Sequence, residues 1–148
     1  MGQYYFSAEK GTIYSSEALQ NPDSTKITIE SNLLPIQLLE NVITDTHFSE
    51  RNREGRLLSF MANTDERFNT NSIGIGVDES TSLIVEDKRM LKTGRGNVYI
   101  YRQPISKQQG LNLGPIYRHC LSNNEVYPPL QEIREGYTTI NVINGEIK

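Results

Sequence analysis

The sequence predicts a mixed α/β domain. Short apolar segments with the character of β-strands lie on either side of a stretch with helical periodicity, and polar or glycine-containing turns separate them. The chain has 148 residues, which is the usual size of one domain and long enough to bury a hydrophobic core. We therefore treat residues 1–148 as a single domain.

The first forty residues give weak signals. Tyr4, Tyr5 and Phe6 look like buried helix residues with nothing before them, which is an abrupt start for a domain. A short helical turn is expected at Ser15–Leu19, and the alternation at Lys26–Glu30 is typical of a strand. The apolar run Leu33–Leu39 is compatible with either structure.

The middle of the chain is better defined. Asn41–Asp45 predicts a short strand built on Val42 and Ile43. A helix is expected from Arg53 to about Ala62, because Leu57, Leu58 and Met61 recur at helical spacing. The polar segment Asn63–Asn71 is then expected to form a loop.

Glycines mark the next predicted strand, Ser72–Val77, which carries Ile73, Ile75 and Val77 on one face. Glycine on the opposite face indicates a backbone packed closely against a neighbour. Gly94-Arg95-Gly96 is expected to be a hairpin turn, since no phosphate-binding motif surrounds it. Further strands are expected at Ser82–Glu86, Asn97–Tyr101 and Thr138–Ile143, the last closed by a turn at Asn144-Gly145. Residues 103–136 are expected to be an irregular extension.

Composition excludes several classes of protein. The net charge of −3 argues against a general nucleic-acid-binding surface, and no apolar run approaches the ~20 residues of a membrane span. No signal peptide is visible, so we expect a cytoplasmic protein. The single cysteine, Cys120, excludes an internal disulfide framework, and the five tyrosines from Tyr99 onward are most simply packing residues.

Two segments concentrate the chemistry. TDTHFSERNREGRLL, from Thr44 to Leu58, holds an Asp, a His and three Arg directly after an apolar run. IGIGVDEST, from Ile73 to Thr81, is an apolar strand that ends on a carboxylate pair. A strand that delivers a His, followed by one that delivers a Glu, is typical of a hydrolase site assembled at strand ends. No nucleophile elbow of the form G-x-S-x-G is present in the chain.

Both segments resemble the cyanophycinase and aspartyl dipeptidase (peptidase E) family of serine peptidases. In that family a D-x-H-F-x-x-R-x-R-x-x-R-L stretch precedes a G-I-x-x-D-E-x-T-A-L stretch, and the order and spacing fit apart from a longer loop around residues 63–72. The resemblance covers about residues 2–101, and more loosely the final strand. It implies a three-layer α/β domain with a flavodoxin-like fold, similar to that of the class I glutamine amidotransferases.

The resemblance assigns roles to individual residues. His47 matches the general base that takes the serine proton, and Glu79 matches the acid that orients it. A substrate pocket for aspartyl carboxylates or a β-linked Asp-Arg unit is implied, because arginine holds carboxylates with a planar fork. The residues expected to line it are Asp45, Thr46, Arg51, Arg53 and Arg56. Thr46 stands where cyanophycinases carry Gln, which points to a divergent, peptidase-like branch.

The absence of a nucleophile elbow is the larger departure from the family. The segment from Met1 to Leu19 resembles the family's helix that comes directly after the elbow, so we expect the elbow and several strands to lie before Met1. Ser7-Ala8 superficially matches the Ser-Ala of the elbow, but Phe6 and Glu9 stand where glycines are needed. Cys120 lacks an elbow as well. On this interpretation the chain is the C-terminal part of a longer enzyme, inactive alone, and the strand Ile73–Val77 lacks one neighbour.

Other interpretations remain open. On residue type alone, His47 is more often a structural histidine, Glu79 a turn carboxylate and the arginines a solvated helix face. The chain is also compatible with a non-catalytic remnant that binds peptides or a partner. A third option is a metal site formed by Asp45, His47 and Glu79. We expect no cofactor, a peptide substrate with aspartyl residues, and either a homodimer or association with a missing N-terminal half.

Overall fold

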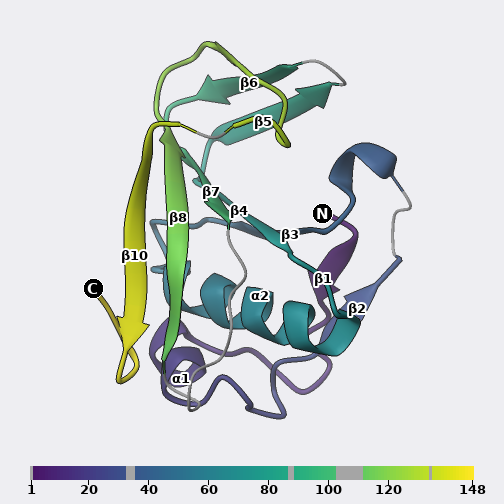
Figure 1. Cartoon of the computed structure of the whole chain (residues 1–148), viewed down its shortest axis with the longest axis vertical. Helices are drawn as coiled ribbons and strands as arrows, with labels where there is room; N and C mark the ends of the chain where they lie inside the picture. The colour runs from purple at the N-terminus through teal and green to yellow at the C-terminus, as the bar shows by residue number, and fades with distance from the viewer. Residues whose placement is uncertain (1, 33–35, 87–88, 103–111, 134) are drawn as a thin grey trace.

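The chain forms a strongly twisted eight-stranded mixed sheet with a smaller three-stranded sheet beyond one end (Figure 1). The structure, a computed structural model, describes residues 2–32, 36–86, 89–102, 112–133 and 135–148. Its elements are β1 (Tyr4–Phe6), α1 (Ser15–Gln20), β2 (Ile29–Ser31), the 3₁₀ helix η1 (Gln37–Leu39), β3 (Val42–Thr46), α2 (Glu54–Phe68), β4 (Ile73–Val77), β5 (Thr81–Glu86), β6 (Arg89–Gly94), β7 (Val98–Arg102), β8 (Leu113–Leu121), β9 (Val126–Tyr127), β10 (Tyr137–Ile143) and β11 (Glu146–Ile147).

The parallel part of the large sheet determines where its loops meet. The strand order is β11-β10-β8-β7-β4-β3-β1-β2, and the small sheet has the order β5-β6-β9. Strands β1, β3 and β4 run parallel, whereas the remaining pairs in the large sheet are antiparallel. Because the carboxyl ends of parallel strands lie at one edge of a sheet, the segments after these three strands share that edge.

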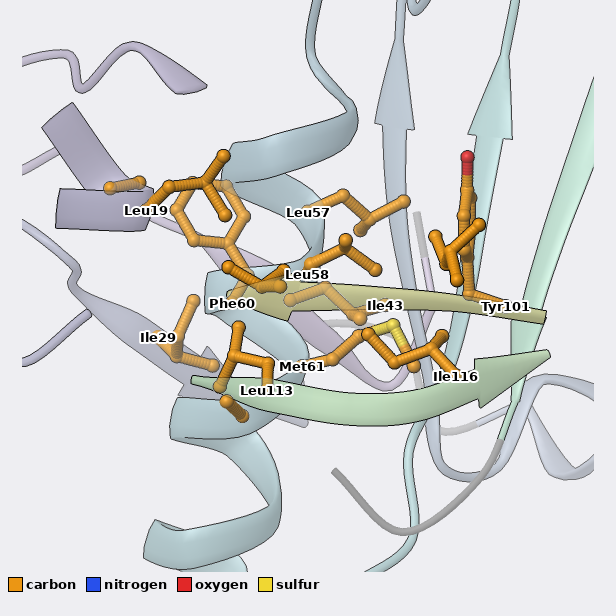
Figure 2. Packing of buried hydrophobic residues seen from close by; sticks show 14 of the residues in the cluster. Leu19, Ile29, Ile43, Leu57, Leu58, Phe60, Met61, Tyr101, Leu113 and Ile116 are labelled. Atoms are coloured by element: carbon orange, nitrogen blue, oxygen red, sulfur yellow. The ribbon is translucent and has the colours of Figure 1, made fainter. Parts of the chain in front are cut away.

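Helix α2 covers one face of the sheet through the apolar side predicted from the sequence. Leu57, Leu58 and Met61 are fully buried. They pack in a cluster with side chains from the sheet and from α1, as Figure 2 shows. The labelled members of this cluster include Leu19, Ile29, Ile43, Phe60, Tyr101, Leu113 and Ile116.

The predicted end of this helix was wrong, because α2 continues to Phe68 through the expected polar loop 63–71. Two of the polar side chains there bond to carbonyl groups one turn earlier in the helix. Thr64 Oγ1 donates to the carbonyl of Phe60 at 2.8 Å, and the Asn63 amide donates to the carbonyl of Ser59 at 2.9 Å. The helix ends at Asn69, whose left-handed conformation (φ 49°) is a common helix terminator.

The glycines of β4 allow helix and sheet to approach closely, as the sequence predicted. A Cβ at Gly74 would lie 2.4 Å from the Met61 sulfur, and one at Gly76 would lie 2.6 Å from the Phe48 ring. Both distances are too short for real atoms, so side chains at these positions would separate β4 from its covering layer.

The other face of the sheet packs against the small sheet and the segment after it. Val42, Ile75 and Ile100 from the large sheet form a second buried cluster with Met90 of β6 and Leu130. The predicted α/β class is therefore confirmed. In the described part of the chain, however, this second cluster takes its cover from β-structure and loops and not from a layer of helices.

Two predictions about the N-terminal region were wrong. Tyr4–Phe6 forms β1, not a helix, because it pairs with β2 on one side and with β3 on the other. Strand β4 also has neighbours on both sides, β3 and β7, so the missing neighbour expected at Ile73–Val77 is not observed.

The expectation of an irregular extension over 103–136 was also wrong in part. Residues 103–111 and 134 lie outside the described residues, but Leu113–Leu121 forms the longest strand described, β8. Gly114 and Pro115 hid this strand in the sequence. The structure accommodates them where the register with β10 shifts between Ile140 and Val142, an irregularity at which proline is tolerated.

The small sheet is held by a buried lysine. Lys92 of β6 is 1% exposed, and its ammonium group donates to Gly94 O at 3.1 Å, Ser122 O at 3.2 Å and Asn124 Oδ1 at 3.0 Å. These acceptors join the β5–β6 hairpin to the loop between β8 and β9.

None of the helices in the described residues is long and apolar enough to cross a membrane.

Replacing Lys92 by Met should destabilise the protein, because three partly buried acceptors lose a charged donor while the apolar stem is kept. We expect a loss of about 1–3 kcal/mol in the free energy of unfolding, measured by urea denaturation. The matched control is Lys26→Met, which removes an exposed ion pair with Glu17 and should cost less than about 1 kcal/mol. Equal effects of the two substitutions would contradict this account of Lys92.

Candidate functional site

The residues after β3 and β4 bring an imidazole and a carboxylate together. His47 comes directly after β3, and Glu79 follows β4 by two residues. The parallel register pairs Thr46 with Val77, so both loops leave the same edge of the sheet. His47 Nδ1 lies 3.5 Å from Glu79 Oε1, slightly longer than an ordinary hydrogen bond. The predicted proximity is therefore confirmed, and the catalytic roles remain a prediction.

The backbone around this pair is fixed by Asp78, a residue to which sequence reasoning gave no role. Asp78 is buried, and its Oδ1 accepts the Ser49 N–H at 2.9 Å while Oδ2 accepts the Asn97 N–H at 2.9 Å. It thus ties the loop after β3 to the turn before β7. The available signal was its position, a carboxylate that ends an apolar strand directly before Glu79.

The arginine cluster at the start of α2 holds an anion from within the chain. Arg56 binds Asp45 through both ends of the carboxylate, with Nε–Oδ2 and Nη2–Oδ1 distances of 2.6 Å. Arg53 Nη1 adds a bond to Asp45 Oδ1 at 2.9 Å and one to the Thr46 carbonyl at 2.7 Å. Asp45 is only 7% exposed. The carboxylate expected from a substrate is thus supplied here by Asp45 itself, and contact of Asp45 and Arg56 with a substrate stays a prediction.

The other predicted pocket residues differ in exposure from the buried Asp45 and Arg56. Thr46 and Arg51 are exposed. Arg51 is not part of the ion pairs around Asp45 among the described residues.

The interpretation of Asp45, His47 and Glu79 as a metal site fails on geometry, because both Asp45 oxygens are bound by guanidinium groups. The described residues contain no group of three or more His, Cys, Asp or Glu side chains arranged to hold a metal ion.

A polar cleft of about 230 Å³ lies between the segment that follows His47 in the sequence, the start of α2, and strands β7 and β8. At its floor Glu54 Oε1 accepts the Tyr101 hydroxyl at 2.7 Å and Arg118 Nη1 at 3.0 Å. Burial raises the pKa of Tyr101, and the Glu54 carboxylate raises it further, so the phenol stays protonated and donates. The lining residues are Phe48, Ser49, Asn52, Arg53, Glu54, Tyr99, Tyr101 and Arg118. Sequence reasoning missed Glu54 and Arg118, since Arg118 lies in the strand that was predicted to be irregular.

Ser7 lies at the same edge of the sheet as the predicted pair. It comes directly after β1, and the parallel register Tyr4–Ile43 carries the end of β1 to the same edge as the end of β3. Its surroundings are not those of an elbow. The Ser7 hydroxyl donates to Thr28 Oγ1 at 2.9 Å, and α1 begins only at Ser15. The left-handed residue in the turn is Ala8 (φ 54°).

Cys120 of β8 is paired with Tyr99, which is itself paired with Gly76, so it stands level with the carboxyl end of β4. It lines a larger cavity, of about 510 Å³, together with His119 and Glu132. Burial raises the pKa of the Cys120 thiol, so the thiolate needed for nucleophilic attack is disfavoured.

Three known proteins that resemble this chain all carry the same name. No family model matches the chain. A protein named cyanophycinase from Geminocystis herdmanii is 39% identical over 100 residues, which covers 61% of this chain and 35% of the relative. Proteins of the same name from Trichormus variabilis and Nostoc sp. are each 42% identical over 64 residues, covering 43% of this chain.

The chain therefore spans about a third of the length of the first relative and 20% of the length of each of the other two. Three similarities to proteins of one name, together with the two motifs at the carboxyl edge of β3 and β4, support a relation of this chain to the cyanophycinase family.

Proposed function

We propose that this chain supplies the proton-transfer pair of a serine-type peptidase that hydrolyses peptides containing aspartyl residues. The observation that carries the proposal is the His47–Glu79 pair, 3.5 Å apart at the carboxyl ends of adjacent parallel strands. The similarity to proteins named cyanophycinase favours a peptidase over other uses of such a pair.

In this proposal each nitrogen of the imidazole has its own task. Nδ1 faces Glu79, so this carboxylate holds the tautomer in which Nε2 is free to accept a proton. During acyl transfer Nε2 would take the proton of the attacking serine, and Glu79 would stabilise the imidazolium that results. The same imidazolium would then protonate the leaving amine.

The nucleophile decides whether the isolated chain is active. Ser7 is at the right edge, but its hydroxyl is bonded to Thr28, and no helix begins directly after it to provide oxyanion donors. We therefore propose that full activity requires a serine elbow from a preceding segment, and that the chain alone binds peptides with little turnover. Peptide binding without hydrolysis is the second candidate function, favoured by the arginine-lined cleft.

Hydrolysis of aspartyl dipeptides by the isolated chain should be near the level of the buffer. Joining the chain to the N-terminal half of a homologous enzyme, with its elbow, should restore turnover, since the oxygen nucleophile and the oxyanion donors return together. In that enzyme His47→Ala should lower kcat by roughly 10⁴-fold or more. Glu79→Gln should also lower kcat, whereas Glu86→Gln, an exposed change on β5, should not.

The Ser7→Ala variant of the isolated chain is the decisive comparison for the nucleophile. Robust hydrolysis by the unmodified chain that disappears in Ser7→Ala would assign the nucleophile to Ser7. That result would end the proposal of an elbow in a preceding segment. Turnover that persists in the joined enzyme after His47→Ala would end the assignment of the general base.

Substitutions in the arginine cluster should separate structural from substrate-binding roles. Asp45→Asn should lower the free energy of unfolding by about 3 kcal/mol, because it leaves the buried Arg56 guanidinium without its counter-charge. Arg51→Gln, an exposed change in the same segment, should cost less than about 0.5 kcal/mol. Urea denaturation of both variants measures this difference. An Asp45→Asn protein as stable as the unmodified chain would contradict a structural role for this ion pair.

A further inference from the structure

The cavity of about 510 Å³ beside β8 has no role in the proposed peptidase. His119 and Leu121 line it and are two residues apart in β8, so their side chains point to the same face of the sheet. Leu121 packs in the second buried cluster with Ile133 and Tyr127, whereas α2 packs in the first. The cavity is therefore on the face opposite α2, bounded by β8, β9 and the segment after β9.

The walls of this cavity suit an apolar group. Leu121 and Ile133 are buried, and Tyr127 and Pro128 add further apolar surface. The Tyr127 hydroxyl is already used, since it donates to the carbonyl of Asn123 at 3.2 Å. A volume of about 510 Å³ is within the range of ~300–1,000 Å³ that is usual for small-molecule sites. The hydrophobic effect therefore favours a ligand with an apolar body of several carbon atoms.

A buried imidazole in the cavity has one nitrogen in use and one free. His119 is 2% exposed, and its Nδ1 lies 3.0 Å from the carbonyl oxygen of Glu135, so Nδ1 carries the proton of this bond. Burial lowers the pKa of His119 and the charge of Arg102 lowers it further, against the opposite effect of the Glu135 carbonyl, so Nε2 holds a lone pair near pH 7. Nothing among the described residues bonds to Nε2, and the atom is not fully enclosed, so it is open to the cavity.

The charged side chains at this cavity are carboxylates. Glu132 and Glu135 line it and are exposed, and neither carboxylate takes part in an ion pair or hydrogen bond within the described part of the chain. None of the described residues that line the cavity is a lysine or an arginine. Arg102, whose charge reaches His119, is not one of them. Because Nε2 of His119 and both carboxylates are acceptors, a matching ligand brings donors and a positive charge.

We propose that this cavity is a second ligand site, which takes a primary ammonium group carried on an apolar body about the size of a phenethyl group. An ammonium has three donors on a compact head, which suits three acceptor groups from the separate residues His119, Glu132 and Glu135 better than the planar fork of a guanidinium. The apolar body would lie against Leu121 and Ile133. Binding at this site is independent of any catalysis at the carboxyl edge of β3 and β4.

Binding is tested on the full chain with two probes of nearly equal shape. Phenethylamine is protonated at pH 7, whereas 2-phenylethanol has a neutral hydroxyl in the same place. Each is titrated into the protein while amide chemical shifts are followed by NMR. We expect phenethylamine to bind about tenfold more tightly, with shifts at Leu121, Ile133 and Gly136, since a hydrogen bond to a charged group is worth about a factor of ten. Equal affinities, no binding of phenethylamine at millimolar concentration, or shifts confined to other parts of the chain would overturn the proposal.

A third probe tests the nature of the head group. The compound 2-phenylethylguanidine has the same apolar body but carries a planar, five-donor cation. We expect it to bind more weakly than phenethylamine, because its donors are fixed in one plane and the acceptors come from three separate residues. Binding of the guanidine that is as tight as that of phenethylamine, or tighter, would overturn the choice of an ammonium group.

Variants assign the binding to named residues. His119→Asn keeps a donor for the Glu135 carbonyl but removes Nε2, and should weaken phenethylamine binding about fivefold, with a thermal melt to check that the variant folds. Glu132→Gln combined with Glu135→Gln changes two exposed side chains and should remove most of the preference for phenethylamine over 2-phenylethanol. The control Glu86→Gln changes an exposed carboxylate of β5 paired with Arg89 and should alter neither affinity. Equal effects of the double variant and the control would reject the site.

Discussion

The bidentate ion pair between Asp45 and Arg56 is the interaction on which the carboxyl edge of the sheet depends. It joins the end of β3 to the first turn of α2, so the connection that carries His47 is closed at both ends. Arg53 strengthens the closure by binding both Asp45 and the Thr46 carbonyl. A buried carboxylate is tolerated because its oxygens accept charged donors at short distances.

A second constraint acts from the interior of the sheet. Gly74 and Gly76 let β4 lie directly beneath Met61 of α2 and the ring of Phe48. Phe48 also contacts Tyr99 and Tyr101, with ring centroids 5.5 and 5.9 Å apart. The residue after His47 is therefore packed into the core, which anchors the half-exposed histidine through its neighbour. Positioning of the candidate pair thus combines ion pairing on one side with aromatic packing on the other.

The parts of the fold that sequence could predict are those with local signals. Helical spacing of Leu57, Leu58 and Met61 predicted α2, and the glycine-bearing apolar run predicted β4. Tyr4–Phe6 was misassigned because a three-residue strand owes its conformation to pairing partners distant in sequence. Strand β8 was missed because Gly114 and Pro115 are strand-breaking residues that only the irregular register with β10 permits. The motifs located His47 and Glu79, whereas Arg118 could not be found from local pattern, since it reaches the cleft through tertiary folding.

The exposure of the candidate pair has a consequence for its strength. The side chains of His47 and Glu79 are 40% and 60% exposed, so water of high dielectric constant surrounds both groups. At a separation near 4 Å, attraction between unit charges is about 1 kcal/mol in bulk water and about 4 kcal/mol at an effective dielectric constant of 20. The influence of the carboxylate on the imidazole is therefore small until something displaces the solvent. A bound peptide, or another polypeptide segment laid over this edge, would displace that water, and the attraction between an imidazolium and a carboxylate in this unchanged geometry would rise toward the larger of the two figures.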